Sequence, residues 1–338
     1  MKIHNLDLGQ RPLLLAPMED VTDPSFRFMC KHFGADLMYT EFVNSDGLIR
    51  DANSCLTKLK IYDSERPMGI QLYGHIVESM VEAACIATEA SPDLIDINFG
   101  CPVKKIANRG AGSGMLKDVP KMVEMTRQIV NATHLPVTVK TRIGWDEESK
   151  NIVEIAERLQ DVGISAITIH GRTRAQLFRG QADWTLIEAV KENPRMHIPV
   201  IGNGDVDGPQ KAQEMFDRYG VDAIMIGRAT YGRPWIFKEI KHFMSTGAQM
   251  KPLTVEEKVE IAKKHLSKSL EYKGERRGIL EMRRHLSCYF KGLPHFKELR
   301  LKLVTSDCPD EINMMLCHIA EQYKGFIPDE RINPSPWE

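Results

Sequence analysis

Residues 137–170 read VTVKTRIGWDEESKNIVEIAERLQDVGISAITIH. The runs Val137–Thr141 and Ala166–His170 are short, rich in β-branched residues and nearly continuous in apolar character. Such runs are typical of strands that are buried on both faces of a sheet. Between them, the apolar residues of Asn151–Val162 recur at helical spacing. The stretch therefore predicts one strand–helix–strand unit with two parallel strands.

The same alternation continues on both sides of this unit, up to about residue 230. We expect eight strands, at Leu13–Ala16, Asp36–Thr40, Met68–Leu72, Leu94–Asn98, Val137–Thr141, Ala166–His170, Pro199–Gly202 and Ala223–Ile226. Other helical patterns lie at Val77–Ala90, Val119–Ala132 and Pro209–Tyr219. Eight strands spaced by helices favour an α/β fold, a (β/α)8 TIM barrel, over an open doubly wound sheet. No GxGxxG sequence follows a strand, which weakens the dinucleotide-fold alternative.

After about residue 240 the pattern changes to helices alone. Residues 245–252 are small, polar and punctuated by proline, which is typical of a linker. Helical spacing then predicts helices at Val255–Tyr272, Gly278–Lys291, Phe296–Thr305 and Glu311–Tyr323. We therefore expect a barrel domain over residues 1–244, a small C-terminal helical bundle over residues 253–330, and a loose tail at residues 332–338.

Charge is divided unevenly between these two parts. The whole chain of 338 residues has a net charge of −1, so it cannot coat nucleic acid indiscriminately. Residues 238–305, however, hold 16 Lys and Arg against 8 Asp and Glu, an excess of 8 positive charges. A solvated helical surface also carries many lysines, but an excess of this size favours a polyanionic partner.

The cysteines and the hydropathy of the chain indicate in which compartment the protein is expected. The seven cysteines include no CxxC pair, so reduced thiols are a simpler interpretation than a disulfide framework or a zinc ribbon, and we expect no metal site. The first residues are polar, and no apolar stretch approaches the roughly 18 residues that a membrane span needs. We expect a soluble, cytoplasmic protein with no membrane association and no obligatory protein partner.

The carboxyl ends of the predicted strands carry an unusual set of residues. In a parallel barrel these ends meet at one rim, where active sites form. The rim residues are Ala16, Pro17 and Met18 after the first strand, Gln71, Asn98, Cys101, Lys140, Arg142 and His170 at the third to sixth, and Asn203, Gly204, Asp205, Gly227 and Arg228 at the last two. Any one of them could be an ordinary loop residue, but the whole set indicates a functional rim.

Part of this rim is suited to a phosphate group. Gly204 and Gly227 would expose backbone N–H groups just before helices, at the two strands where barrels often bind phosphate. Arg228 can add a charge-assisted contact. Either glycine alone could instead serve a tight turn.

The remaining polar residues suggest a flavin. Lys140 closes an apolar strand and should point into the mouth, either as a Schiff-base nucleophile or as a cation beside an electron-rich ring. Gln71 and His170 offer hydrogen bonds to the edge of an oxidised heterocycle. Together with the phosphate site they describe an FMN site better than an aldolase.

Cys101 is the sharpest candidate for chemistry. It follows a glycine in a strand-to-loop turn and precedes Pro102 and two lysines, so it is a candidate acid or nucleophile. The basic, glycine-rich segment that follows, residues 104–114, could close over a substrate, or could be an ordinary surface loop.

With these residues identified, the chain resembles the tRNA-dihydrouridine synthases, of the bacterial B type. The matching segments, in family order, are Ala16-Pro17-Met18 with Thr22-Asp23 and Phe26-Arg27, Gln71, Asp96 to Pro102, Gly110 to Ser113, Val139 to Trp145, Ile169 to Arg174, Asn203 to Val206, Ile226-Gly227-Arg228, and Gly232 to Trp235. The resemblance covers residues 10 to about 240 strongly and the helical part more loosely.

The resemblance implies a flavoprotein that uses FMN and NADPH, or alternatively NADH, to reduce tRNA uridine to 5,6-dihydrouridine. Its flavin contacts fall on Ala16, Pro17, Met18, Gln71, Lys140, His170, Asn203, Gly204, Asp205, Gly227 and Arg228. Its proton donor falls on Cys101, and its uracil-holding residues fall on Asn98 and Arg142. The basic helical domain would then bind the tRNA phosphates.

Two other functions remain open from the sequence. One is an FMN-dependent barrel that reduces a free small molecule, although this would leave the basic helical part unexplained. The other is a non-catalytic RNA-binding protein that keeps the barrel as a scaffold, although intact Lys140, Cys101 and glycine loops argue against it.

Overall fold

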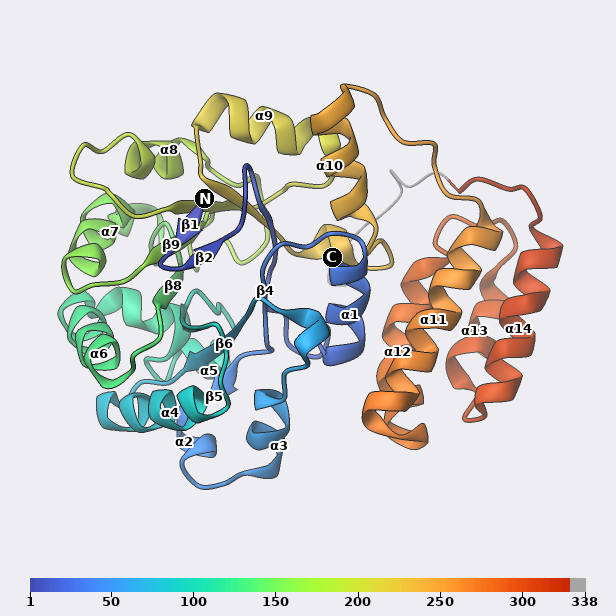
Figure 1. The fold of residues 1–338 in the computed structure, drawn as a ribbon, viewed down its shortest axis with the longest axis horizontal. Coiled ribbons are helices and arrows are strands. Elements are labelled where there is room, and N and C mark those ends of the chain that lie inside the picture. Colours follow the sequence, from blue (N-terminus) through green and yellow to red (C-terminus); the bar gives the residue numbers. More distant parts are fainter. Residues whose placement is uncertain (329–338) are drawn as a thin grey trace.

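The computed structural model describes residues 1–328, so the tail predicted at 332–338 lies outside the described residues. A barrel surrounded by helices lies beside a group of four further helices (Figure 1). The barrel strands are β3 (Leu13–Leu15), β4 (Met38–Tyr39), β6 (Met68–Tyr73), β7 (Leu94–Phe99), β8 (Val137–Arg142), β9 (Ala166–His170), β10 (Val200–Asn203) and β11 (Ala223–Ile226). All eight predicted strands are confirmed, with ends that shift by no more than two residues.

Parallel pairing closes these strands into a cylinder. Their order is β3-β11-β10-β9-β8-β7-β6-β4. β3 then returns to the segment before β4, where Leu14 bridges Leu37 and the N–H of Leu15 donates to the Leu37 carbonyl at 3.0 Å. A short strand that the sequence does not predict, β5 (Val43–Asn44), pairs with the end of β6. The (β/α)8 barrel prediction is therefore confirmed.

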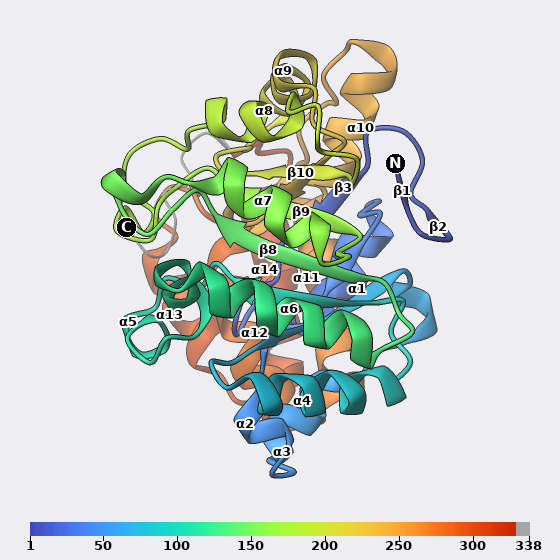
Figure 2. The ribbon, with the colours of Figure 1, turned by 90° about the vertical axis from the view of Figure 1, so that its left-hand side faces the viewer.

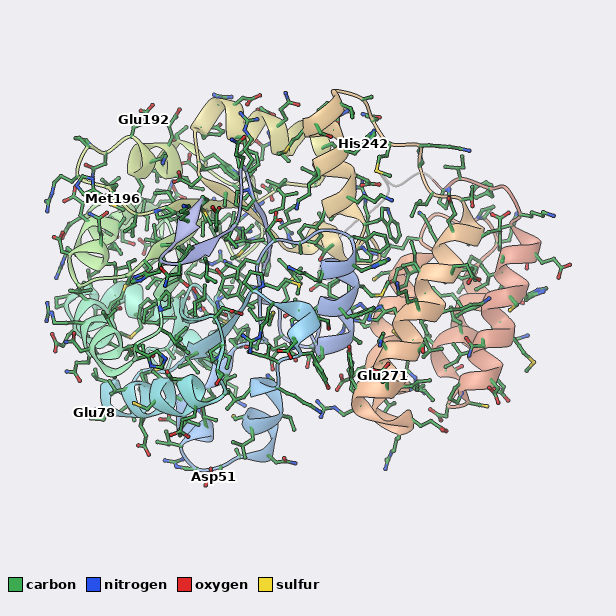
Figure 3. All side chains as sticks on the ribbon, in the orientation of Figure 1. Asp51, Glu78, Glu192, Met196, His242 and Glu271 are labelled. Atoms are coloured by element: carbon green, nitrogen blue, oxygen red, sulfur yellow. The ribbon has the colours of Figure 1, made fainter. Side chains whose placement is uncertain are left out.

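Helices cover the outside of the barrel (Figure 2). They are α1 (Pro24–His32), α2 (Ser45–Leu48), α3 (Asn53–Leu56), α4 (Val77–Glu89), α5 (Lys104–Ala107), α6 (Val119–Ala132), α7 (Ile152–Asp161), α8 (Thr185–Lys191), α9 (Pro209–Tyr219) and α10 (Ile236–Thr246), with 3-10 turns η1 (Thr57–Leu59), η2 (Asp63–Glu65), η3 (Gly112–Lys117), η4 (Glu147–Ser149) and η5 (Arg228–Thr230). The charged side chains of Glu78 and Glu192 point outward from this layer (Figure 3). The four predicted barrel helices correspond to α4, α6, α7 and α9.

The amino-terminal end of the barrel is covered by a small hairpin. Strands β1 (Lys2–Ile3) and β2 (Leu6–Asp7) pair antiparallel. Ile3 and Leu8 are buried in one cluster with barrel-interior residues such as Leu14, Ile201 and Met225. This end is therefore filled by apolar side chains, and the barrel offers its opposite, carboxyl end to ligands.

The C-terminal helices form a second apolar cluster. They are α11 (Val255–Lys273), α12 (Glu275–Tyr289), α13 (Lys297–Thr305) and α14 (Pro309–Gln322), close to the predicted bounds. Their core includes Val259, Leu266, Leu286 and Leu316. Residues 245–246 still belong to α10, so the connecting segment starts two residues later than predicted. No described helix is long and apolar enough to cross a membrane.

A buried polar cluster joins the barrel to the helical bundle. Asp23 caps α1 by accepting from the backbone N–H of Ser25 and Phe26. Its carboxylate also lies 2.9 Å from Lys273 Nζ on α11, and both side chains are almost fully buried. His265, also on α11, lies within hydrogen-bond distance of Ser25 Oγ, at 3.3 Å. The two parts of the chain are therefore locked at the loop that leads from β3 into α1.

This cluster predicts a pH dependence of stability. Burial, aided by nearby His285, holds the pKa of His265 well below its usual value. The unfolded chain takes up this proton near pH 6.5, whereas the folded chain resists it, so stability is fully present above that pH and is lost as the pH falls below it. Urea unfolding measures the free energy of unfolding at about pH 7 and at about pH 5.5. Between these pH values, the free energy of unfolding of His265→Gln should fall by about 1 kcal/mol less than that of wild type.

The matched control is His4→Gln, which changes an exposed histidine in the amino-terminal hairpin. It should keep the wild-type pH slope. Equal slopes in all three proteins would show that His265 is protonated as easily in the folded chain as in the unfolded one.

Candidate functional site

A cavity of about 1520 Å³ opens at the carboxyl end of the barrel. Of the sequence-predicted site residues, it is lined by Ala16, Pro17, Met18, Asn98, Cys101, Lys140, Arg142, His170, Asn203, Gly204, Asp205, Gly227 and Arg228. Gln71 is fully buried behind this wall. The cavity also touches the segment between barrel and bundle, through Gln249 and Met250.

Strand register explains why these side chains converge. Asn98 on β7 pairs with Lys140 on β8, while Arg142 on β8 pairs with His170 on β9. His170 pairs in turn with Asn203 on β10. Side chains two residues apart on a strand point to the same face. Lys140 and Arg142 therefore project together into the mouth of the barrel.

Lys140 is a buried cation with a fixed direction. Its Nζ donates to Asn203 Oδ1 at 3.1 Å, and Asn203 Nδ2 donates to the carbonyl of Met225 at 2.8 Å. Burial, with the nearby Arg142, lowers the pKa of Lys140 to about 8. The ammonium is therefore still the main form at neutral pH, and it lines the cavity.

His170 is held neutral by its surroundings. Burial and the cations Arg142 and Lys140 keep its pKa well below the usual value. Its Nε2 lies 3.4 Å from Nη1 of Arg172. Because a guanidinium can only donate, Nε2 is the acceptor and the ring proton lies on Nδ1.

Asp205 organises the cationic side of the cavity. Its carboxylate accepts from Arg172 Nη2 at 2.8 Å, from Arg228 Nη2 at 3.2 Å and from the N–H of Ala182 at 2.7 Å. Gly204 has a φ of +129°, and a Cβ there would lie 2.6 Å from the Ala182 side chain. The chain can therefore make this turn only with glycine at position 204.

The expectation that Gly204 and Gly227 lie just before helices is wrong. Helix α9 begins only at Pro209, and Gly227 is followed by the single 3-10 turn η5. Neither glycine directly precedes an α-helix, so the dipole adds little at either position. Anion binding here would rest on backbone N–H groups and on Arg228.

Cys101 is held by its backbone, and its thiol is buried. Its N–H donates to Asn98 Oδ1 at 2.9 Å, and its carbonyl accepts from Ser113 Oγ at 2.7 Å. The residue is only 8% exposed, and burial raises the pKa of its thiol. The neutral thiol favours a role as an acid over a role as a nucleophile.

Behind the cavity wall, a chain of buried hydrogen bonds orients Asn98. Asn98 Nδ2 donates to Gln71 Oε1 at 2.8 Å, and Gln71 Nε2 donates to Asp96 Oδ2 at 2.6 Å. Burial raises the pKa of Asp96 to about 6, which leaves it mainly ionised at neutral pH. A carboxylate accepts only, so it sets the direction of both amides. Asp96 is a positioning residue that the strand-end argument misses, because its side chain precedes the rim.

Arg142 ties two loops together. Its Nε donates to the carbonyl of Gly100 at 2.8 Å, and its Nη1 donates to the carbonyls of Thr173 and Leu177 at 3.0 and 2.8 Å. Within residues 1–328, Nη2 of Arg142 donates no hydrogen bond to a protein group. Burial lowers the pKa of Arg142 to about 9, so it remains cationic at neutral pH. Nη2 is thus the atom with which Arg142 can meet a ligand.

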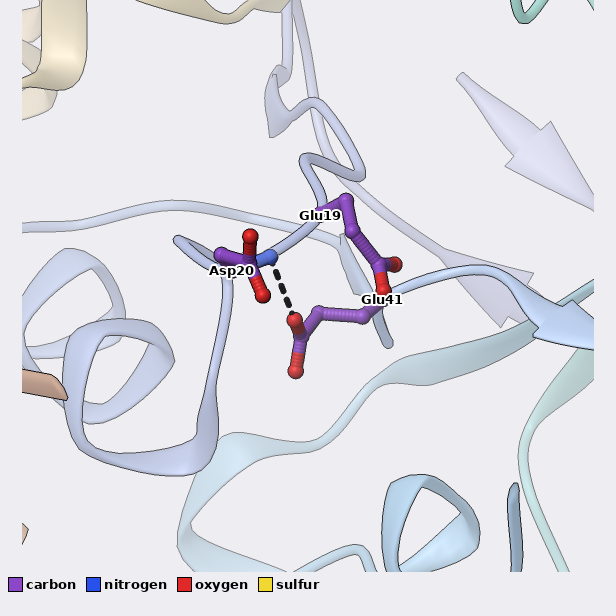
Figure 4. A group of neighbouring side chains, drawn as sticks. All are labelled: Glu19, Asp20 and Glu41. Carbon is purple, nitrogen blue, oxygen red and sulfur yellow. Dashed lines mark hydrogen bonds between the residues drawn. The ribbon is translucent and has the colours of Figure 1, made fainter. Parts of the chain in front are cut away.

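Three acidic side chains lie at the same carboxyl-end rim, after β3 and β4, and their carboxylates approach one another (Figure 4). They are Glu19, Asp20 and Glu41; Glu41 accepts from the N–H of Asp20 at 2.6 Å, and Glu19 pairs with Lys58. Burial raises the pKa of Glu41 to about 7. Asp20 also pairs with Arg284 at 3.5 Å, so nearby cations partly neutralise this edge. Arg142 and Arg228 in the cavity wall are cations that can attract a phosphate group.

Sequence reasoning also misses Phe178, an aromatic residue in the cavity wall. It lies in the loop between β9 and α8, and its only signal is an apolar Leu177-Phe178 pair within a polar segment.

Comparisons with known proteins agree on one family. A family model described as dihydrouridine synthase matches residues 14–322. The tRNA-dihydrouridine synthase B of Pseudomonas aeruginosa is 41% identical over 290 residues, which cover 85% of this chain and 86% of that protein. A probable tRNA-dihydrouridine synthase of Rickettsia conorii is 39% identical over 301 residues, which cover 89% of this chain and 90% of that protein. A solved structure of a morphinone reductase mutant aligns with a TM-score of 0.52 at 14% identity, over 75% of this chain and 91% of that one, and this likeness shows the fold alone.

Proposed function

The chain belongs to the dihydrouridine synthase family, and from this premise we propose that it reduces uridines in tRNA to 5,6-dihydrouridine, with FMN as cofactor and NADPH as electron donor. The observation that carries the proposal is the meeting of a neutral Cys101 thiol with the cations Lys140 and Arg142 in one cavity.

The residues present are compatible with FMN. The cavity, at about 1520 Å³, has room for a flavin and a base together, since small-ligand sites usually span roughly 300–1,000 Å³. The glycine turn at Gly204 lets the backbone approach a ligand closely, and Arg228 supplies a cation for a phosphate. Lys140 would hold the electron-rich edge of the ring, and neutral His170 can donate a hydrogen bond through Nδ1.

The chemistry divides between the cofactor and the protein. Bound FMN, once reduced by NADPH, would supply a hydride to C6 of the uracil. Negative charge then develops on the C4 oxygen, where Arg142 Nη2 and the second N–H of Asn98 can donate hydrogen bonds to it. The thiol of Cys101 donates its proton to C5, which completes the saturated bond.

The helical part supports a tRNA substrate. The stretch 238–305 carries the excess of 8 positive charges, and part of it, at Gln249 and Met250, lines the cavity. We propose that residues 1–244 form the catalytic domain and residues 253–330 a tRNA-binding domain. A nucleotide must leave its stack to enter the barrel, and phosphate contacts on the helices would hold the RNA meanwhile.

The direct test is incubation of the purified protein with NADPH and tRNA that lacks dihydrouridine, followed by mass spectrometry of the digested nucleosides. We expect dihydrouridine to appear at defined tRNA positions. Reduction of free uracil with no change in the tRNA would instead indicate a small-molecule reductase. A colourless protein that binds tRNA would indicate a non-catalytic RNA-binding protein.

Loss of either cofactor-facing cation should weaken flavin binding. Because a hydrogen bond to a charged group contributes about 1.5–3 kcal/mol, Lys140→Ala and Arg228→Ala should each raise the Kd for FMN roughly 10- to 100-fold. The measurement is flavin fluorescence during titration of the flavin-stripped protein.

Lys211→Ala is the control, since Lys211 is a surface residue of α9 paired with Glu214. It should keep the wild-type Kd. Stoichiometric FAD in the purified protein, or wild-type FMN affinity in both cavity variants, would overturn the cofactor assignment.

A further inference from the structure

The aromatic side chain of Phe178 is exposed at the surface of a cavity. It is 41% exposed and lies in the wall of the main cavity, at the border of a smaller pocket that also involves Arg179 and Arg228. An aromatic ring left this open in a cavity wall offers an apolar surface to whatever enters the cavity.

Two buried arginines hold the loop that carries this ring. Arg142 Nη1 donates to the carbonyl of Leu177 at 2.8 Å. Arg172 donates to the carbonyls of Arg179 and Gly180, at 3.2 and 2.5 Å. Both guanidinium groups belong to residues that are only 2% exposed. The backbone on each side of Phe178 is therefore anchored to a strand end.

The backbone just before Phe178 is strained. Leu177 has a φ of +56°, a conformation that costs a bulky residue on the order of 1–3 kcal/mol. Such strain persists only where surrounding contacts impose it, and it clusters at ligand sites. Here Arg142 holds the Leu177 carbonyl, and the Leu177 N–H donates to the carbonyl of Arg174 at 3.1 Å, so hydrogen bonds fix both backbone groups just before the ring.

Cations surround the ring. The guanidinium carbon of Arg142 lies 5.7 Å from the ring centroid, and that of Arg228 lies 5.0 Å from it. A ring with two guanidinium groups over it offers flat surfaces and positive charge, which match the flat base and the anionic phosphate of a nucleotide. Unpaired bases in RNA are commonly bound by stacking on such rings and guanidinium planes.

Resting on the proposed function, we propose that Phe178 is a stacking platform for a tRNA base adjacent to the uridine that is reduced. Arg142 bonds to the carbonyl of Gly100 in the Cys101 turn and to the carbonyl of Leu177 in the Phe178 turn. The same guanidinium therefore links the ring to the turn that carries the proton donor. The reacting base would have the flavin and Cys101 on its two faces. Its neighbour, unstacked when the uridine leaves the RNA, would find a new stacking partner in Phe178.

The experiment compares Phe178→Leu, which keeps an apolar side chain but removes the flat ring, with Phe178→Tyr, which keeps the ring. The Kd of each FMN-loaded protein for tRNA without dihydrouridine is measured by fluorescence anisotropy. We expect Phe178→Leu to raise this Kd roughly 5- to 100-fold, and Phe178→Tyr to stay near wild type. Leu56→Ala, an exposed apolar change on α3 outside the helical domain and the cavity wall, is the surface control and should have no effect.

The rate of flavin reduction by NADPH and the flavin content are measured on the same proteins, and both should stay within about twofold of wild type. Slower flavin reduction with unchanged tRNA affinity would overturn the proposal in favour of stacking on the nicotinamide. Loss of flavin from Phe178→Leu, or an unchanged Kd in both variants, would also overturn it. Since tRNA affinity is read directly, wild-type protein that binds tRNA but makes no dihydrouridine would overturn only the proposed function.

Discussion

Replacing Cys101 with alanine is expected to slow dihydrouridine formation by about 10²–10⁴-fold, the usual cost of removing a general acid. Flavin content and flavin reduction by NADPH should be nearly unchanged, because the thiol acts only when C5 of the uracil takes up its proton. The measurement is single-turnover oxidation of the reduced enzyme by tRNA. Cys101→Ser should recover little activity, since an alcohol is a much weaker acid than a thiol.

The structure indicates that this variant will fold. The turn at Cys101 is held by the backbone bonds to Asn98 and Ser113, which alanine keeps. Cys55→Ala is a matched control, because Cys55 is also 8% exposed but does not line the cavity. Oxidation of Cys101→Ala by tRNA at the wild-type rate would remove this thiol from the mechanism. A large fall in melting temperature would show instead that it is a packing residue.

Replacing Lys273 with methionine should lower the free energy of unfolding by about 3–5 kcal/mol, the usual cost of leaving one partner of a buried ion pair uncompensated. Lys273 Nζ lies 2.9 Å from Asp23 and 2.9 Å from Glu281, and its side chain is only 7% exposed. Removal of the cation leaves the Asp23 carboxylate buried between barrel and bundle. Urea unfolding at neutral pH gives the change.

Lys263→Met provides the comparison, because Lys263 lies on the same helix and pairs with Glu260 at the surface. Its cost should stay within about 1 kcal/mol. The double variant Asp23→Asn with Lys273→Met should recover part of the loss, since it removes the uncompensated charge. Equal costs for the two lysine variants would mean that the Asp23 pair adds nothing beyond a surface pair.

Local sequence carries most of the fold. Runs such as Ala166–His170 and Ala223–Ile226 are apolar because both faces of each strand are buried, and that pattern is visible without any structure. Short elements such as α2, α5 and β5 escape prediction. At two to four residues they have no periodicity of their own, and β5, for example, forms only by pairing with β6.

The candidate site divides in the same way. The rule that parallel strands end at one rim identifies Lys140, Arg142 and His170 from their place in the chain, and they do line one cavity. The rule does not say which groups each side chain forms hydrogen bonds with. The Gln71 side chain, predicted to contact the cofactor, bonds to Asp96 and Asn98, and the rule does not identify these two partners.

The order of residues along the chain thus specifies the barrel, the helical part and the set of side chains at the rim. Burial of both strand faces gives continuous apolar runs, and the end of each run shows which residues lie at the rim. The state of those side chains depends on groups far away in the sequence. Arg142 is directed by Leu177, the Cys101 thiol is kept neutral by burial, and His265 meets Ser25 from 240 positions away. Protonation, hydrogen-bond direction and the exposure of Phe178 follow from desolvation and contact in space, and these arise only when the chain has folded.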